Sequence, residues 1–403
     1  MRFRSALSTA ADVDSACAEC ASVLLDDPSA GAPDLLFAFA SPKLGTIDRV
    51  APGLAGRVAP RMLAGCSGGG VLASGREIET RGGLATLAAW LPGADAKVRH
   101  LRREDLPDGD AAPSHWHELL DVDPARVRGI AVFPDPWSFP VAALLEGLDY
   151  AFPRARKFGG LVSGGDGPMD QHLFVDDQSL ERGAILVALL DGIRVDTVVA
   201  QGCRPIGRAG TVTDGAGQDL VGVDGRPALT FLQEQIDSLD ADEMEAVRRS
   251  TMFIGLAMDP FALETPDDGE YLMRNIVGLD RKRGSLAIAG RPAIGRKVRF
   301  HLRDAKASDL DLHRTLGQID CSHPPLGAML FSCVGRGRHM YGHPDHDSRA
   351  FQRVVGAVPI AGFFCNGEIG PVGGHTHLHG YTSAFALFRP LGNGGPRPSE
   401  PGR

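Results

Sequence analysis

Cysteines followed by glycine-containing loops recur at four places in the sequence. They are Cys66, Cys203, Cys333 and Cys365, and each follows an apolar run that predicts a strand. A glycine after a strand lets backbone N–H groups approach a ligand or an anion closely. Cysteine is also a common small, buried residue at strand ends, so packing alone is the alternative. We interpret the four loops as candidates for one shared ligand site.

The loop after Cys66 is the richest in glycine and offers nucleophile chemistry. The Cys66 thiol and the Ser67 hydroxyl stand at a strand-to-turn junction, and the N–H groups from Gly68 onward can hold an oxyanion. A nucleophile needs a base, and only folding could bring His301 or His379 to this loop. The spacing also lacks the G-x-S-x-G pattern of a nucleophile elbow. We favour ligand contact over catalysis for this loop.

Charged residues in other runs have the chemistry to bind a small zwitterion. Arg204 lies in the run Gln-Gly-Cys-Arg-Pro that begins at Gln201, and a guanidinium binds a carboxylate at two points. Arg274 and Arg336 suggest the same role. Glu368 follows a glycine and can bind an ammonium group, so an arginine and a glutamate in one cleft would make an amino-acid site. The alternatives are solvated surface arginines and a glutamate that caps or pairs locally.

Histidines near the end of the chain have the spacing of metal ligands on a strand. His375, His377 and His379 alternate, so a strand would turn all three imidazoles to one face. A second stretch, residues 343–347, is rich in His and Asp and is also typical of helix capping. Neither has the H-E-x-x-H pattern, and no glycine-rich nucleotide-binding motif follows a strand. We expect no metal and no cofactor.

The composition argues against several classes of function. The 403 residues include 42 Lys+Arg and 50 Asp+Glu, a net charge of −8 without a basic stripe, which argues against nucleic acid and anionic membrane surfaces as partners. No apolar run approaches the roughly 18 residues of a membrane helix, and no signal peptide is seen. Seven cysteines without disulfide spacing favour a reducing compartment. We expect a cytoplasmic protein with no nucleic-acid and no membrane partner.

Alternating strands and helices must position these residues. An Asp-capped helix is predicted over residues 12–26 and another helix over 228–249. Two apolar runs, 184–190 and 193–200, are joined by Asp-Gly, which predicts a hairpin with a type I′ turn. A closing strand is expected over 376–388.

The sequence pattern resets after residue 205. A glycine-rich polar stretch over 207–227 predicts a crossing between domains. We predict a first domain over residues 1–205, a second over 206–390 and a disordered tail over 391–403. The expected fold class is α/β with α+β character. It has two mixed α/β domains whose sheets are largely antiparallel or mixed.

Longer runs give the sequence a family resemblance that covers residues 30–388, nearly the whole chain. The most distinctive runs are Gln201-Gly202-Cys203-Arg204-Pro205-Ile206-Gly207 and Cys365-Asn366-Gly367-Glu368-Ile369-Gly370-Pro371. Others are Ala64-Gly65-Cys66-Ser67-Gly68-Gly69, Phe300-His301-Leu302-Arg303-Asp304 and Leu378-His379-Gly380-Tyr381-Thr382. With these runs in this order, the chain resembles the FIST family, in which a FIST N domain precedes a FIST C domain.

The resemblance implies an intracellular sensory module that binds a small ligand, with amino acids as the suggested class. We expect the ligand in a cleft between the two domains, near Cys66, Ser67, Gly68, Gln201, Cys203, Arg204, Arg274, Arg336, Cys365, Gly367, Glu368 and His379. The signal would pass to a separate signalling protein or through a homo-oligomer. Two alternatives stay open: an enzyme with Cys66 or Cys365 as nucleophile, and a protein–protein adaptor without a small ligand.

Overall fold

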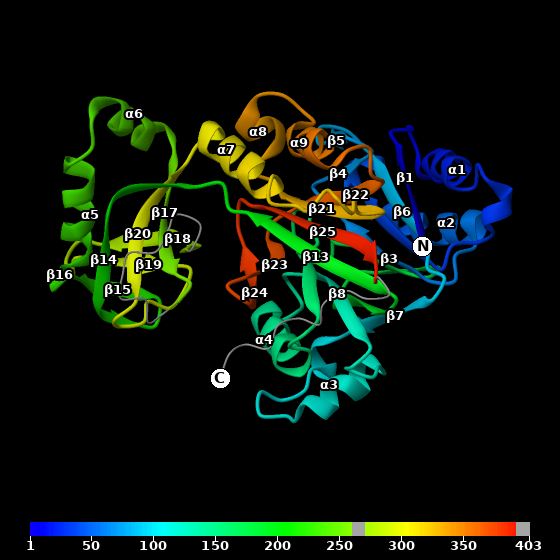
Figure 1. Ribbon diagram of the computed structural model, residues 1–403, viewed down its shortest axis with the longest axis horizontal. Coiled ribbons are helices and arrows are strands. Elements are labelled where there is room, and N and C mark those ends of the chain that lie inside the picture. Colours follow the sequence, from blue (N-terminus) through cyan, green and yellow to red (C-terminus); the bar gives the residue numbers. More distant parts are fainter. Residues whose placement is uncertain (260–270, 392–403) are drawn as a thin grey trace.

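The computed structural model describes residues 1–259 and 271–391 and consists of a broad body with a smaller lobe beside it (Figure 1). The predicted tail, apart from Leu391, lies outside the described residues. No helix in the described ranges is long and apolar enough to cross a membrane.

The body repeats one order of elements, β-α-β-α-β-β-β-β, along the chain. The first copy is β1 (Arg2–Ser8), α1 (Val13–Leu24), β2 (Leu35–Ala40), α2 (Val50–Val58), β3 (Leu63–Ser67), β4 (Gly70–Ala73), β5 (Arg76–Ile78) and β6 (Leu84–Trp90). The second copy is β7 (Ala94–Leu101), α3 (Pro113–Leu120), β8 (Val127–Pro134), α4 (Val141–Ala151), β9 (Arg156–Gly160), β10 (Leu173–Val175), β11 (Gln178–Leu180) and β12 (Ala184–Asp191).

The third copy is interrupted after its first strand by the lobe. Its elements are β13 (Ile193–Ala200), α7 (Ala305–Leu316), β21 (Gly327–Cys333), an additional short α8 (Gly337–Tyr341), α9 (His346–Val355), β22 (Ile360–Cys365), β23 (Glu368–Val372), β24 (His375–His379) and β25 (Ser383–Pro390). The body is therefore made of residues from both ends of the chain, and in Figure 1 the blue β4 lies beside the orange β22, with which it pairs.

Each copy forms a six-stranded sheet with the same pattern of neighbours. The strand orders are β1-β6-β2-β3-β10-β11, β7-β12-β8-β9-β23-β24 and β13-β25-β21-β22-β4-β5. In each sheet the middle pair is parallel, namely β2 with β3, β8 with β9 and β21 with β22, and the other pairs are antiparallel.

The last two strands of each sheet come from a different copy, so the three copies exchange their hairpins in a cycle. The hairpin after β3 joins the third sheet, the hairpin after β9 joins the first, and the hairpin after β22 joins the second. Strands from both predicted sequence domains therefore share sheets. The division between residues 205 and 206 remains a prediction about the sequence, and the sheets of the body do not follow it.

The main core lies between the three sheets and repeats residue by residue. Phe39, Phe133 and Phe331 occupy the same position in the three copies and are fully buried. The rings of Phe39 and Phe133 lie 5.6 Å apart, and those of Phe133 and Phe331 lie 6.1 Å apart. Aromatic burial at this hub provides a large part of the driving force that holds the three sheets together.

The lobe is a closed antiparallel barrel with two helices on its surface. Its elements are β14 (Arg204–Ala216), β15 (Asp219–Val223), β16 (Arg226–Pro227), α5 (Ala228–Asp237), α6 (Ala241–Arg249), β17 (Thr251–Ala257), β18 (Tyr271–Asp280), β19 (Ser285–Ile288) and β20 (Lys297–Arg303). The strand order β14-β20-β17-β18-β19-β15 closes because β14 also pairs with β15. Closure leaves few free strand edges.

The fold class is confirmed, and several local predictions are also correct. The helix predicted over 12–26 is α1, and Asp12 caps it by accepting a hydrogen bond from the Ser15 N–H. The predicted strands over 184–190 and 193–200 are β12 and β13, and Asp191 between them has a left-handed φ of 52°.

Four local predictions are wrong, and the first of them, the hairpin, is wrong because strands that are adjacent in sequence do not pair. β12 pairs with β7 and β8, whereas β13 pairs with β25 in another sheet, so the predicted hairpin does not form. The closing strand over 376–388 is two strands, β24 and β25. The helix over 228–249 is split into α5 and α6 by the Asp240 cap, and the expected crossing over 207–227 consists mainly of barrel strands.

Candidate functional site

The chain passes between the body and the lobe twice, and the two crossings build a cavity. The outgoing crossing, residues 201–204, leads from β13 into β14, and the return leads from β20 directly into α7. A cavity of about 810 Å³ lies against both crossings, and its walls include Cys203, Arg204, Ser250, Asp304, Asp311 and Arg314. We call it the junction cavity. Its size is in the range of small-molecule sites.

Charges of both signs line the junction cavity. Arg204 Nε lies 3.4 Å from Asp304 Oδ2, and Arg314 Nη2 lies 2.7 Å from Asp311 Oδ1. Asp304 also caps α7, since its Oδ1 accepts a hydrogen bond of 2.7 Å from the Ala307 N–H. The Arg204–Asp304 contact is longer than the usual 2.7–2.9 Å of a charge-assisted bond, and both side chains are partly exposed. These two groups are thus open to exchange partners with a ligand.

Hydrogen bonds hold the outgoing crossing in place from both sides. The Gln201 side chain donates to the Tyr271 carbonyl at 2.7 Å and accepts from the Met273 N–H at 3.0 Å, which ties the crossing to β18. On the body side, Ser308 Oγ donates to the Gly202 carbonyl at 3.0 Å. Arg303 Nη2 lies 3.2 Å from Cys203 Sγ. Burial raises the pKa of the Cys203 thiol, so it is neutral at pH 7.

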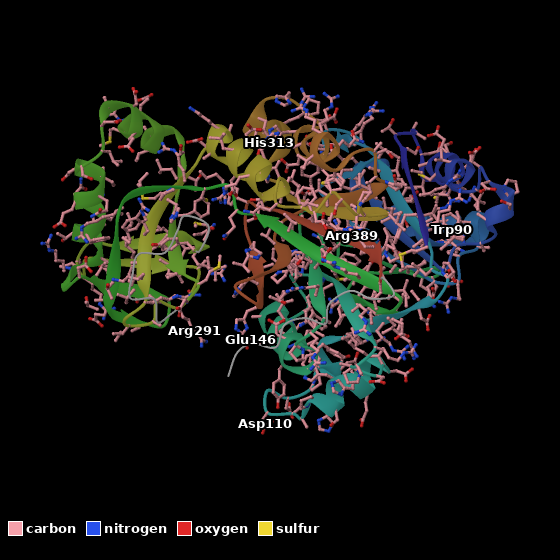
Figure 2. The ribbon with its side chains drawn as sticks, in the orientation of Figure 1. Trp90, Asp110, Glu146, Arg291, His313 and Arg389 are labelled. Atoms are coloured by element: carbon pink, nitrogen blue, oxygen red, sulfur yellow. The ribbon has the colours of Figure 1, made fainter. Side chains whose placement is uncertain are left out.

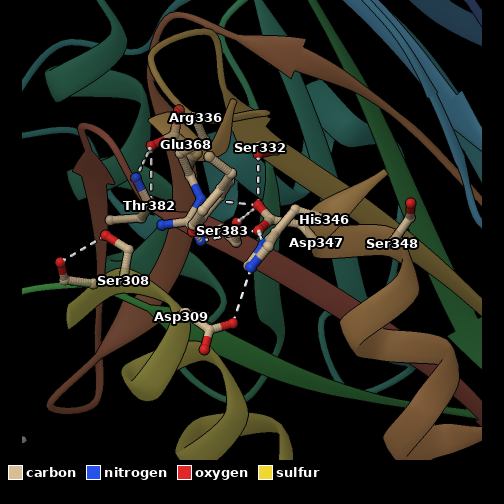
Figure 3. A network of polar contacts seen from close by, with 12 residues as sticks. Ser308, Asp309, Ser332, Arg336, His346, Asp347, Ser348, Glu368, Thr382 and Ser383 are labelled. Atoms are coloured by element: carbon tan, nitrogen blue, oxygen red, sulfur yellow. Dashed lines mark hydrogen bonds and ion pairs between the residues drawn. The ribbon is translucent and has the colours of Figure 1, made fainter. Parts of the chain in front are cut away.

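A buried polar network lies in the body next to these crossings (Figure 3). Arg336 and Asp347 form its centre, and Asp347 Oδ2 also accepts a hydrogen bond of 2.9 Å from Ser332 Oγ and one from Ser383 Oγ. His346 links this centre to α7, because its Nδ1 lies 3.0 Å from Asp347 Oδ1 and its Nε2 lies 2.9 Å from Asp309 Oδ1. The network therefore connects α9, where Asp347 lies, to the helix that borders the junction cavity.

Two consecutive family models match the chain. The FIST N domain model matches residues 34–226, and the FIST C domain model matches residues 228–371. The chain belongs to the FIST family. An uncharacterized protein of Mycobacterium tuberculosis is 36% identical over 393 residues, covering 96% of this chain and 100% of the relative. An uncharacterized protein of Mycobacterium bovis is 34% identical over 394 residues, covering 96% and 99%.

Two solved structures of cyanuric acid hydrolase also resemble this FIST chain at a low level. One, from A. caulinodans, has 9% sequence identity and a TM-score of 0.35, and covers 96% of this chain and 99% of that chain. The other has 11% identity and a TM-score of 0.32, and covers 97% and 100%. These scores are too low to carry an argument about this FIST protein.

The predicted site residues of the FIST chain fall into separate groups. Cys203 and Arg204 line the junction cavity, and Gln201 stands directly before them in the crossing. Arg336 is not part of the cavity wall but lies close to Gly202, since its Nη1 would be 3.1 Å from a Cβ placed on that glycine. Its carboxylate partner is Asp347 of the same chain, so its position differs from that of a solvated surface arginine.

A second group surrounds Glu368 in the interior of the FIST body. Glu368 is fully buried, and its Oε2 accepts hydrogen bonds from the Thr382 N–H at 2.9 Å and from Thr382 Oγ1 at 2.8 Å. Cys365 Sγ donates to Glu368 Oε1 at 3.4 Å. Burial raises the pKa of Glu368 to about 7 and raises the pKa of Cys365 well above the ordinary value. His379 is the register partner of Glu368 in the pairing of β23 with β24. Gly367 lies directly before Glu368, in the turn between β22 and β23.

A third group, the loop of Cys66, lies elsewhere in the FIST body. Cys66 is fully buried in the central core, and burial raises its pKa well above the ordinary value. Ser67 Oγ accepts a hydrogen bond of 3.1 Å from the His172 N–H. A Cβ on Gly68 would lie 2.6 Å from Cβ of Phe363. This loop therefore packs against the strand that ends at Cys365, and it does not line the junction cavity.

Arg274 and His379 lie where the lobe meets β24. Arg274 Nη1 donates to the Leu378 carbonyl at 3.2 Å, and desolvation lowers its pKa to about 10. His379 Nε2 lies 3.0 Å from the Gly370 carbonyl, and burial lowers the pKa of His379 to about 3. Of the alternating histidines, His375 is exposed and His379 is buried. In the described ranges, no group of three or more His, Cys, Asp or Glu is arranged to hold a metal ion.

Sequence reasoning missed the acidic side of the junction cavity and the buried network of the FIST chain. Asp304 and Arg303 lie in a run that carries the family resemblance, but nothing in that run indicates that it returns to Cys203. Asp311 lies on a helical face that predicts ordinary surface charge. Asp347 was visible only as part of the His- and Asp-rich stretch, whose capping interpretation does not specify a buried arginine as partner.

Proposed function

We propose that this FIST protein is a sensory module that binds a small carboxylate-bearing ligand, such as an amino acid, in the junction cavity. The observation that carries the proposal is the composition of the cavity wall. Cys203 and Arg204 come from the crossing into the lobe, and Asp304 comes from the crossing back. A ligand there contacts both parts of the molecule at once. Cavities between structural units are common ligand sites.

The charge pattern supports a ligand with a carboxylate and an ammonium group. Arg204 would bind the carboxylate through its planar guanidinium, and Asp304 would accept from the ammonium group. Both groups are paired with each other through a long 3.4 Å contact, so the ligand would replace one weak contact by two stronger ones. Arg314 and Asp311 form a second pair in the same wall.

The sensory output would be a change in how firmly the lobe is held against the body. The crossings are fastened by Gln201 to β18 and by Ser308 to the body. In this proposal the lobe has two placements against the body, one held more firmly than the other. A ligand that contacts both crossings shifts the equilibrium between them only by the difference in its affinity for the two placements. A separate signalling protein, or a second copy of the chain, would receive the signal.

A thermal-shift screen of the purified protein against amino acids, organic acids and nucleotides tests the proposal. A ligand present at 100 times its dissociation constant should add about 2.7 kcal/mol to the free energy of unfolding. Arg204→Ala should lose the shift. Arg208→Ala, four residues further along and paired with Asp224 outside the cavity, should keep it. Absence of any shift across the panel, or an unchanged shift in folded Arg204→Ala, would contradict the proposal.

A further inference from the structure

Arg303 differs from the other buried cations in the part of the chain that the structure describes. Four Lys or Arg residues there are less than 9% exposed. Lys157 is paired with Asp149 at 2.9 Å, Arg336 with Asp347 at 2.8 Å, and Arg389, marked in Figure 2, with Asp196. Arg303 is 4% exposed, yet no described carboxylate forms an ion pair with it. Buried charges are normally paired, because an unpaired one is costly to desolvate.

The contacts of Arg303 leave one edge of its guanidinium incompletely used. Nη1 donates to the Gly380 carbonyl at 3.4 Å, and Nη2 donates to the Gln201 carbonyl and to Cys203 Sγ. Nε is buried and has no hydrogen-bond partner. The rings of Phe253 and Tyr381 lie 4.3 Å and 5.2 Å from the guanidinium carbon. The edge with Nε and Nη2 is one of the two edges with which arginine binds a carboxylate or phosphate at two points.

The nearby groups that could carry a negative charge do not neutralise Arg303. The Cys203 thiol is neutral, because burial raises its pKa, and sulfur is a weak acceptor. Glu368 is the nearby carboxyl group, but its pKa is about 7 and its oxygens are bound to Thr382 and Cys365. A negative charge on a ligand would therefore find a cation that lacks a counter-ion.

A second guanidinium with an unsatisfied N–H group lies close to residues 202–203. Arg336 is fully buried, and its Nη1 has no hydrogen-bond partner. This nitrogen would lie 3.1 Å from a Cβ on Gly202, the residue before Cys203. Two nitrogens on separate arginines, Arg303 Nε and Arg336 Nη1, thus lack acceptors near residues 202–203. Buried unsatisfied donors in a native protein often mark the place of a missing partner.

We propose that Arg303 is the anion-binding group of a subsite directly behind Cys203, and that this subsite takes a small oxyanion. The oxyanion is a second carboxylate, or a phosphoryl group, on the ligand that Arg204 holds in the junction cavity, so the inference rests on the proposed function and extends it. Turning the Cys203 side chain away frees one N–H of Nη2 while the other stays on the Gln201 carbonyl, and the oxyanion then accepts from Nε and from that freed N–H. Arg336, although its charge is paired with Asp347, keeps one Nη1 donor without an acceptor near Gly202.

Calorimetric titration with sodium acetate and with sodium phosphate tests the subsite, each against sodium chloride at equal ionic strength. The two arms distinguish a carboxylate from a phosphoryl group. The wild type should bind one of them saturably, and Arg303→Gln should bind it at least about tenfold more weakly, since bonds to charged groups are strong. Arg303→Lys, which keeps the charge but loses the planar fork, should be intermediate. Arg208→Gln, a lobe arginine already paired with Asp224, should bind as the wild type does.

A second measurement uses the wild-type arginine, in case Arg303→Gln does not fold. In a Cys321→Ser background, which removes the exposed thiol, alkylation of Cys203 is followed by peptide mass spectrometry. The anion that binds should change the rate of this alkylation at least threefold, because it displaces the sulfur from its contact with Arg303 Nη2. The proposal is overturned if neither anion binds, if Arg303→Gln binds equally well, or if the anion leaves Cys203 alkylation unchanged. If the thermal-shift panel yields a ligand but neither anion binds at Arg303, the subsite is contradicted, whereas the proposed ligand site in the junction cavity is still supported.

Discussion

Arg336 and Asp347 face each other through two parallel bonds in a place that solvent does not reach. Arg336 Nε lies 2.8 Å from Asp347 Oδ2, and Arg336 Nη2 lies 3.0 Å from Asp347 Oδ1. The side chains are 0% and 1% exposed. The pair fixes the start of α9 against the end of β21, and His346 continues the contact to Asp309 on α7. This places the wall of the junction cavity on a rigid support.

Removing one partner of this pair should be strongly destabilising. Asp347→Asn leaves Arg336 buried without a counter-ion, and loss of a partner in a buried pair costs about 3–5 kcal/mol. Urea denaturation measures the effect as a lower transition midpoint. Arg126→Gln breaks the exposed pair with Asp191 and should leave the midpoint close to the wild-type value. An equally small effect of Asp347→Asn would show that the network is not structural.

The repeated architecture predicts that three glycines are equally intolerant of a side chain. A Cβ on Gly65, Gly159 or Gly362 would lie 1.8, 2.0 or 1.7 Å from a carbonyl oxygen of the neighbouring parallel strand. Each single substitution by alanine should therefore destabilise the body, and the three thermal shifts should be similar in size. Gly56→Ala, at an open position in α2, should raise stability by about 0.5–1 kcal/mol. One tolerant glycine among the three would contradict the equivalence of the copies.

Glu368 should make stability fall as the pH rises from about 4.5 to about 7. Its pKa is raised by burial from 4.5 to about 7, so the folded state retains a proton that the unfolded chain releases above pH 4.5. The stability from this group is complete below pH 4.5 and is lost as the pH rises to about 7, at most about 3 kcal/mol. Glu368→Gln cannot ionise, so its stability relative to the wild type should increase from pH 4.5 to 7.

Chemical denaturation at a series of pH values measures this difference. Glu146→Gln, at an exposed position on α4 (Figure 2), serves as the control and should follow the wild-type profile. A constant difference between Glu368→Gln and the wild type over the whole range would show that Glu368 does not titrate in this window.

Thiol reactivity should separate the cysteines by burial. Cys321 is exposed and should react with a thiol reagent in the folded protein. Cys66 and Cys365 are buried with raised pKa values, so they should react only on unfolding. Reaction rates mapped by mass spectrometry check this. If Cys66 or Cys365 reacted as fast as Cys321 in the native state, the cysteine-nucleophile alternative would gain support.

The sequence indicates local structure well and the arrangement of strands poorly. α1 and β2 could be predicted because capping by Asp12 and an unbroken apolar run are local signals. The separation of β12 from β13 could not, because Asp-Gly specifies a turn and contains no information about which sheet each strand joins. The exchange of hairpins among the three sheets depends on contacts between residues that are far apart in the chain.

The candidate site shows the same limit. The run around Arg204 predicts a carboxylate partner, but its neighbour Asp304 is a hundred residues away, and only the return of the chain brings them together. Arg336 has the same side-chain chemistry in the sequence, yet its carboxylate partner is the buried Asp347 of the same chain. The four cysteine loops share a local design, but only Cys203 lines the junction cavity among the described residues.

Hydrogen exchange shows whether a ligand binds at the junction of body and lobe. The protein is measured with and without a saturating amount of the strongest stabiliser from the thermal-shift panel. The account predicts slower exchange in both crossings, residues 201–205 and 304–311, and no such protection in Arg204→Ala. Protection confined to other segments, such as the loop after Cys66, or unchanged exchange in both crossings, would contradict a ligand site at the junction of body and lobe.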